Sequence, residues 1–153
     1  WETVRRIGGR NGWYFAQPLW KLRGLMDRAA GGPGLRRGRR DPVDLRVGDG
    51  LDFWRVVAVE PNQRLLLRAE LQAPGDALLE FRIADLGARR TALEMVSRFL
   101  PRGLAGIAYW YALLPAHQWI FEGMLSAVAR RTGKRVLEGP EAIAVEDPVA
   151  CRL

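Results

Sequence analysis

The sequence predicts an α+β fold in which an antiparallel sheet is followed by one long helix. Four segments have the apolar alternation and the β-branched or aromatic content of strands: 51–60, 64–72, 77–85 and 90–99. They are separated by the short connectors "PNQ", "APGD" and "LGAR", which predicts an antiparallel meander with one face in water. A long helix is predicted over 104–132, where Glu122 is the only charged residue between positions 103 and 129.

Two elements are predicted before the sheet. Segment 1–9, "WETVRRIGG", has the content of a short opening strand that ends at Gly8 and Gly9. A helix is predicted over 15–29, because apolar residues recur there every three or four positions. The residues that share this apolar face are Phe15, Leu19, Leu22, Met26 and Ala29. The residues expected to face water from the same helix are Lys21, Arg23, Asp27 and Arg28.

Alternation along the strands predicts which side chains point inward. The inward set includes Leu65, Leu67, Leu79, Phe81 and Ile83. In the first strand of the meander the phase is ambiguous, and we favour Trp54 pointing inward. The helix over 104–132 is apolar around most of its circumference, so we expect the rest of the domain to enclose it.

Composition is that of one folded domain. The chain has 153 residues, of which 48% are hydrophobic, and a net charge of +7. We expect a domain over 1–135 and a weakly structured tail over 136–153, with a short strand at "AIAVE".

Because the chain begins at Trp1 and not at Met, we expect it to be part of a longer polypeptide. The single cysteine, Cys151, allows no internal disulfide and favours a reducing, cytoplasmic location.

A cluster of arginines invites comparison with a nucleic-acid site. The segment "GLRRGRRDP" contains Arg36, Arg37, Arg39 and Arg40. No basic helix with exposed aromatics and no RNA-binding strand signature accompanies it, and three aspartates follow closely. We therefore interpret the segment as a solvated or salt-bridged connector. The alternatives are a docking surface for an acidic partner or adjoining domain, and a nucleic-acid site.

Other common kinds of site lack their residues in this sequence. Neither "GGRNG" nor "GGPG" has the spacing of a dinucleotide or phosphate loop, so we expect no cofactor in this domain. One histidine and one cysteine do not supply a standard zinc site or a Cys-His dyad, so no metal is expected. The uncharged run 103–121 is interrupted by Pro115 and several glycines, which argues against a membrane span.

The sequence resembles the helix-grip superfamily of START domains, polyketide cyclases and birch-pollen-allergen-like proteins. The resemblance lies in the order strand, helix, four strands and long apolar helix, and in the phrase "FRIADLGARRTALEMVSRFLPRGLAGIAYW". The chain resembles more closely a bacterial domain of unknown function that follows short-chain-dehydrogenase-like NAD(P)-binding domains. The phrases that carry this resemblance are "IGGRNGWYFAQPLWKLRGLMD", "GLRRGRRDP", "VGDGLDFWRV" and "YWYALLPAHQWIFEGML". The resemblance extends from Trp1 to Gly133. It implies a helix-grip fold, in which a curved antiparallel sheet wraps around the last helix and leaves a cavity, and an adjoining NAD(P)-binding domain as partner. It assigns no catalytic motif.

The leading hypothesis for function is an accessory domain, not catalytic on its own, that binds an apolar small molecule between the sheet and the last helix. Ligand sites are mainly apolar with a few polar groups that orient the ligand. The residues expected to line this site are Trp54, Phe81, Phe99, Trp110, Tyr111, His117 and Phe121.

Two alternatives stay open. The first is an interaction module, which covers the substrate cleft of the adjoining domain or forms a homodimer through the helix over 15–29 and the arginine connector. The second is a small cyclase- or dehydratase-like enzyme with His117 as acid or base, since a histidine titrates near neutral pH.

Overall fold

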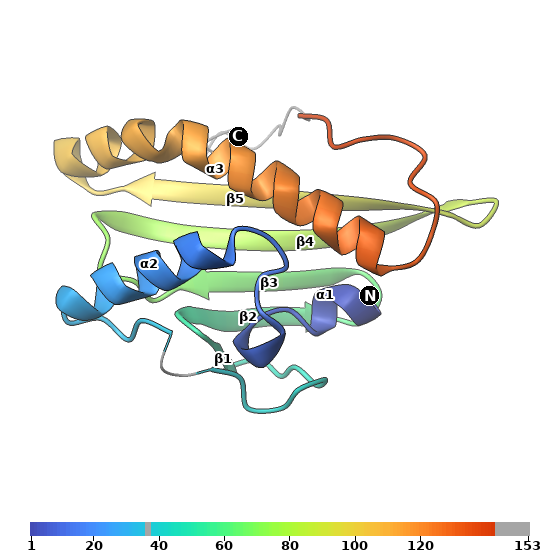
Figure 1. The fold of residues 1–153 in the computed structure, drawn as a ribbon, viewed down its shortest axis with the longest axis horizontal. Coiled ribbons are helices and arrows are strands. Elements are labelled where there is room, and N and C mark those ends of the chain that lie inside the picture. The colour runs from blue at the N-terminus through green and yellow to red at the C-terminus, as the bar shows by residue number, and fades with distance from the viewer. Residues whose placement is uncertain (36–37, 143–153) are drawn as a thin grey trace.

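The fold is an antiparallel sheet with helices on one of its sides (Figure 1). It was obtained as a computed structural model, which describes residues 1–35 and 38–142. The elements, in chain order, are α1 (Glu2–Arg5), the 3₁₀ turn η1 (Gly9–Asn11), α2 (Gln17–Ala29), β1 (Gly50–Leu51), β2 (Trp54–Glu60), β3 (Arg64–Ala69), β4 (Gly75–Gly87), β5 (Arg90–Pro101) and α3 (Gly103–Arg131).

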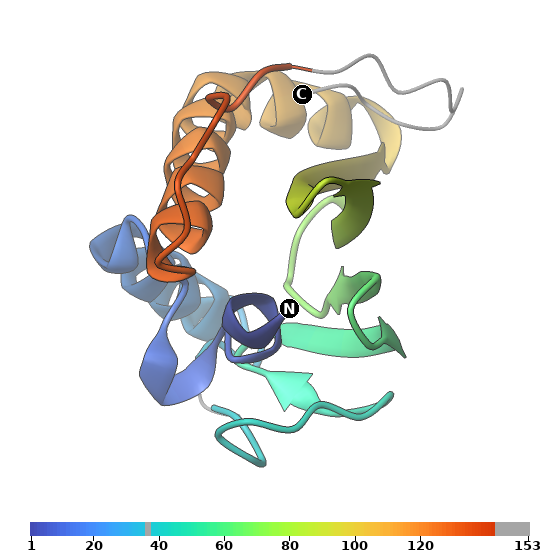
Figure 2. The same cartoon turned by 90° about the vertical axis from the view of Figure 1, so that its right-hand side faces the viewer.

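The five strands form one sheet in the order β1-β2-β3-β4-β5, and every neighbouring pair is antiparallel. The predicted meander is therefore confirmed, with β1 added at one edge. The sheet is curved, and α3 follows it along the chain and packs across it (Figure 2). This arrangement is consistent with a helix-grip fold.

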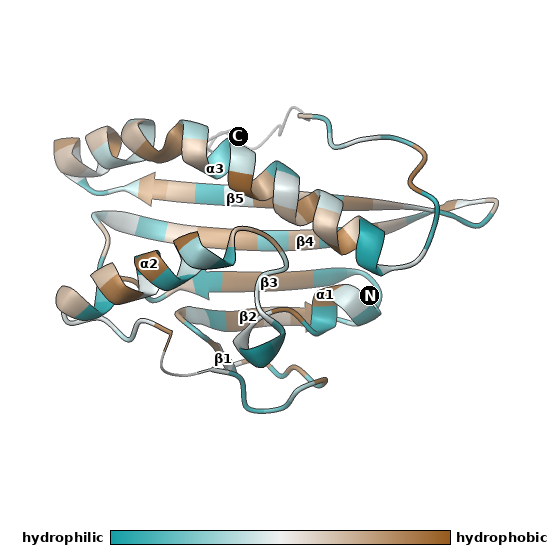
Figure 3. Cartoon of the chain, in the orientation of Figure 1, coloured by the Kyte–Doolittle hydropathy of each residue, from teal (hydrophilic) through white to brown (hydrophobic). Residues whose placement is uncertain are grey.

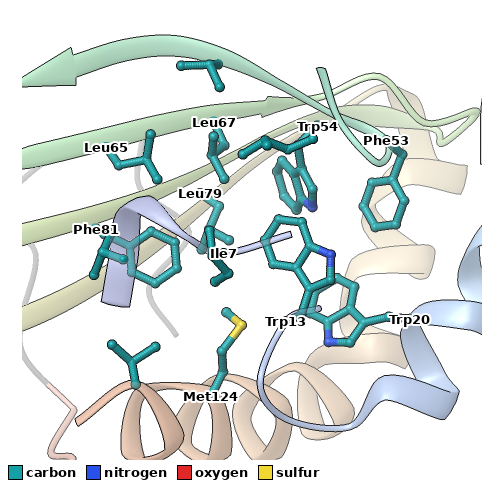
Figure 4. Close-up of a cluster of buried hydrophobic side chains, with 14 residues drawn as sticks. Ile7, Trp13, Trp20, Phe53, Trp54, Leu65, Leu67, Leu79, Phe81 and Met124 are labelled. Atoms are coloured by element: carbon teal, nitrogen blue, oxygen red, sulfur yellow. The ribbon is translucent and has the colours of Figure 1, made fainter. Parts of the chain in front are cut away.

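The inward faces of β3 and β4 form the centre of the core. Leu65 pairs with Phe81 and Leu67 with Leu79, and all four side chains are completely buried, as their alternation predicts. Trp54 also points inward, as expected, and lies with Phe53 and Trp13 at one end of the same cluster (Figure 4).

The opening strand predicted over 1–9 is wrong, because residues 2–5 form the short helix α1. Val4 and Ile7, three residues apart, are both buried, which is helical and not strand spacing. No neighbouring strand takes up the backbone carbonyls of this segment. Instead the Arg39 guanidinium donates hydrogen bonds to the carbonyls of Arg5 and Ile7 at 2.6 and 2.7 Å.

Arg39 and Arg40 show what the described part of the arginine segment does. Arg40 donates two hydrogen bonds to the Asp49 carboxylate, at 2.8 and 3.0 Å, so the expected salt bridge is confirmed for this residue. Arg39 instead holds α1 in place through backbone carbonyls. Arg36 and Arg37 lie outside the described residues, as do Cys151 and all but the first residue of "AIAVE".

Helix α2 forms where it is predicted, but its orientation is the reverse of the expected one. Trp20, Gly24 and Asp27 are buried, while Leu22 and Leu25 are 52% and 62% exposed. Asp27 is inside because its carboxylate accepts hydrogen bonds from the backbone N–H groups of Gly34 and Gln72, at 2.8 and 2.7 Å. These two hydrogen bonds and the stacking of Trp20 on Trp13 together hold α2 in this orientation, against its amphipathic pattern.

Helix α3 is also confirmed, but the expectation that it is enclosed is wrong. One face, including Gly106, Trp110, Met124 and Val128, is buried against the domain. The opposite face carries exposed Leu104, Ile107, Tyr111 and Trp119. Figure 3 shows hydrophobic residues distributed along much of the helix. In the described part of the chain, no helix is both long and apolar enough to cross a membrane.

The outer face of the sheet is organised around one buried carboxylate. Glu80 is almost fully buried and accepts hydrogen bonds from Arg64, Arg82 and Arg98, at 2.5, 3.0 and 2.7 Å. Burial raises the pKa of Glu80, but the three arginine hydrogen bonds outweigh it and lower the pKa to about 2. A buried negative charge therefore holds three strands together through their arginines.

We expect Glu80→Gln to lower the free energy of unfolding at neutral pH by about 2 kcal/mol, because the arginines lose their shared counter-charge. The pKa of Glu80 is lower in the folded protein than its ordinary value of 4.5, so its stabilisation is present above that pH and is lost as the pH falls toward 2. Urea denaturation of both proteins at a series of pH values measures this, with exposed Glu60→Gln as control. Parallel acid destabilisation of wild type and Glu80→Gln would contradict it.

Candidate functional site

Four of the seven predicted site residues lie together on the inner side of α3. The ring of Trp110 stacks on Phe99 of β5, with centroids 5.1 Å apart and planes 7° from parallel. On its other side Trp110 meets His117 at 5.4 Å, and His117 stacks on Phe121 at 5.4 Å with planes 12° apart. His117 lies two turns after Trp110 and Phe121 one turn after His117, so these three rings share one face of the helix as a row of rings.

The other three predicted residues are placed differently. Trp54 and Phe81 are buried in the main core cluster with Trp13, Ile7 and Met124 (Figure 4). Tyr111 is 66% exposed, so it does not line the interior with Trp110. Consecutive residues on a helix point about 100° apart, which separates these two side chains.

His117 is a half-buried histidine within the row of rings. Its Nδ1 atom is buried and has no hydrogen-bond partner among the described residues. Burial lowers the pKa of His117, and the nearby charge of Arg23 lowers it further. The imidazole is therefore held in its neutral form, which offers one donor and one acceptor.

Arg23 is the residue of this site that the sequence interpretation missed. It lies on α2, where the helical pattern places it toward water, yet its Nη2 atom is buried and unpartnered within the described chain. No sequence motif or residue spacing indicates its role, because its position follows from the orientation that Trp20 and Asp27 impose on α2. Its positive charge is near enough to His117 to lower the pKa of the imidazole.

The segment before α2 is what brings that helix close to α3. The ring of Phe15 meets Trp119 of α3 at 4.8 Å in an edge-to-face contact. Gly123 makes this possible, because a Cβ atom there would lie 2.3 Å from the Phe15 ring. The contact joins the two helices at the level of His117, two residues before Trp119.

The arrangement can bind a molecule that has both an apolar and a polar part. The rings of Phe99, Trp110, His117 and Phe121 contact one another in the row, so they offer ring edges and not open faces, and Arg23 and His117 add buried nitrogen atoms that have no partner in the described chain. Two hollows on the described surface, one beside Glu80 and one beside Asp52, are lined by none of the seven predicted residues. Over residues 1–35 and 38–142, no three His, Cys, Asp or Glu side chains are grouped to hold a metal ion.

The single histidine makes the interaction between Arg23 and His117 directly measurable. We expect an NMR titration of the His117 Cε1–H to give a pKa below the usual 6.5, and Arg23→Gln to raise that pKa by removing the nearby positive charge. Because the fold favours the neutral form, stability attributable to His117 is present above about pH 6.5 and is lost as the pH falls through the folded-state pKa.

The control for this titration is Arg28→Gln, on the exposed side of the same helix. It should leave the pKa of His117 unchanged. If Arg23→Gln also leaves it unchanged, the two side chains do not interact.

Comparisons with known proteins identify the family and nothing more specific. Searches of curated proteins and of solved structures gave no match for this chain. A family model described as "Protein of unknown function (DUF2867)" matches residues 1–124, which include α1, α2, the whole sheet and α3 as far as Met124. The curved sheet, the row of rings on α3 and the Arg23–His117 pair therefore belong to a member of the DUF2867 family of proteins of unknown function.

Proposed function

We propose that this domain binds a small, largely apolar molecule between the sheet and α3. The apolar body lies against Phe99, Trp110 and Phe121, and an oxygen acceptor of the ligand is held by Arg23 and His117. The observation that carries the proposal is the presence of two buried polar atoms, Arg23 Nη2 and His117 Nδ1, without partners in the described chain.

Energetics support a ligand at this position. A buried polar group without a partner costs about 1 to 3 kcal/mol, and more when it belongs to a charged group. Arg23 makes no ion pair within the described residues, so its charge is uncompensated there. An anionic or carbonyl oxygen would satisfy the guanidinium, and it would also give the neutral imidazole a group to hydrogen-bond.

The charge balance also indicates the class of ligand. A positive guanidinium beside a histidine that stays neutral favours a carboxylate, sulfonate or carbonyl oxygen over an amine. The edges of the adjacent rings favour an aromatic or fused-ring body. The proposed ligand is therefore an apolar ring compound with one acidic or carbonyl group, and the domain needs no chemistry of its own to bind it.

A pair of fluorescent probes separates the apolar and polar parts of this proposal. 8-Anilinonaphthalene-1-sulfonate has fused rings and an anionic group, and N-phenyl-1-naphthylamine has the same rings without the sulfonate. We expect Arg23→Met to weaken binding of the anionic probe by about tenfold and to leave the neutral probe unaffected. Arg28→Met is the matched control and should change neither.

Thermal unfolding of the same variants tests for a purely structural role. Arg23→Met removes a buried guanidinium nitrogen that has no partner in the described chain, so we expect its Tm to be equal to or higher than that of the wild type. Native mass spectrometry of the wild type, compared with its denatured mass, should show a bound small molecule that Arg23→Met loses. A lower Tm with unchanged binding of both probes would show that Arg23 serves the fold and not a ligand.

The exposed apolar side chains of α2 and α3 favour a second function, that of an interaction module. Both helices lie on the same side of the sheet (Figure 1), and Leu22, Leu25 and Met26 of α2 are each more than half exposed. Contiguous exposed apolar surface commonly marks a contact with another protein. The proposed partner is a second copy of this chain or a preceding NAD(P)-binding domain.

Light scattering of the purified chain tests this second function. We expect a dimer at micromolar concentration, and we expect Leu22→Glu with Leu25→Glu to convert it to monomer without lowering the Tm, because both residues are exposed. The control is Val136→Glu, an exposed apolar residue after α3. A wild-type monomer that also fails to bind the separately expressed preceding domain would exclude this function.

A further inference from the structure

A second hollow lies away from the row of rings, where the N-terminal segment meets the beginning of α2 and the turn between β1 and β2. Its volume is about 420 Å³, a size that admits a small metabolite. The lining residues that bear on its chemistry are Arg10, Trp13, Gln17, Lys21, Gly38 and Asp52. None of them is among the seven ligand-binding residues predicted from the sequence, and none belongs to the site on α3.

A buried carboxylate forms one wall of this hollow. Asp52 is only 6% exposed, and its Oδ2 atom accepts hydrogen bonds from Trp13 Nε1 at 2.9 Å and from the Gly9 backbone N–H at 3.1 Å. Within the described residues its Oδ1 atom accepts none, although a carboxylate can accept several. Burial raises the pKa of Asp52, and the two hydrogen bonds lower it in part.

The rest of the wall supplies positive charge and an amide. Lys21 and Arg10 both line the hollow and are exposed, and neither makes an ion pair within the described chain. Gln17 is held against the backbone of Gly12, where a Cβ atom would lie 1.4 Å from its Nε2. A carboxylate acceptor is thus combined with two free cations around one space, and Gly38 leaves part of the wall without a side chain.

We propose that this hollow binds a small polyol that carries an anionic group. A ligand hydroxyl donates to Asp52 Oδ1, and a phosphate or carboxylate is held by Lys21 and Arg10. Carboxylates accept hydrogen bonds readily from sugar hydroxyls, and exposed lysine and arginine side chains bind both anions. This site shares no residue with the ligand site proposed beside α3, so the two proposals are independent.

The indole N–H of Trp13 is the reporter, because it is hydrogen-bonded to Asp52. Titrations of the ¹⁵N-labelled chain use ribose 5-phosphate and gluconate as probes, which separate the phosphate from the carboxylate source. Ribose and inorganic phosphate, each with only half of the required chemistry, are their controls. We expect a saturable shift of the Trp13 indole signal with at least one anionic polyol. The affinity for ribose alone or phosphate alone should be weaker by at least about tenfold.

The two lysines of the chain provide a matched pair of variants. Lys21→Ala should weaken binding of the anionic polyol by about tenfold, while Lys134→Ala, beyond α3, should not change it. Both residues are exposed, so neither change should alter the Tm. The proposal would be overturned if neither polyol gave a saturable shift. It would also be overturned if both lysine variants weakened binding of the anionic polyol equally, because that would indicate non-specific attraction to a basic chain.

Discussion

The hydrogen bond from Trp13 Nε1 to Asp52 Oδ2 is the constraint on which the N-terminal half of the fold depends. Trp13 is almost completely buried and packs against Trp20, Phe53 and Trp54, with ring centroids 5.1, 6.5 and 6.0 Å away. A buried indole N–H needs an acceptor, and Asp52 supplies it from a residue with a left-handed φ of 55°. The same carboxylate binds Gly9, so the first residues of the chain are joined to the edge of the sheet.

The position of Trp13 sets the orientation of α2, and that orientation has two consequences. Trp20 must stack on Trp13, and Asp27, two turns later, then points inward and accepts hydrogen bonds from Gly34 and Gln72. The apolar residues between them are left outside, which produces the surface that favours an interaction module. Arg23 is carried inward toward His117 by the same rotation. The proposed ligand site and the proposed interaction surface therefore both depend on the stacking of Trp20 on Trp13.

Buried charged groups have ion-pair partners on the outer side of the sheet but not on the inner side, within the described residues. On the outer side the buried Glu80 carboxylate is paired with three arginines, so the buried negative charge is compensated and the cluster serves the fold. On the inner side the Nη2 atom of Arg23 and the Nδ1 atom of His117 are buried and have no hydrogen-bond partner in the described chain. The difference is that Glu80 has ion pairs in the described chain and Arg23 has none, and this is the physical basis for proposing that a ligand binds beside Arg23.

The sequence by itself determined the succession of strands, the long last helix and the helical spacing that Trp110, His117 and Phe121 share, because these follow from local periodicity and from turns with glycine and proline. The stacking of Phe99 on Trp110 was decided by the packing of β5 against α3. The predicted role of these four residues in binding stays a prediction. Only the tertiary structure decided that segment 1–9 forms a helix, that Tyr111 faces water, and that Asp27 and Arg23 point inward. The reason is that buried N–H groups must be paired across distant parts of the chain, and that requirement outweighs the amphipathic pattern of a single helix.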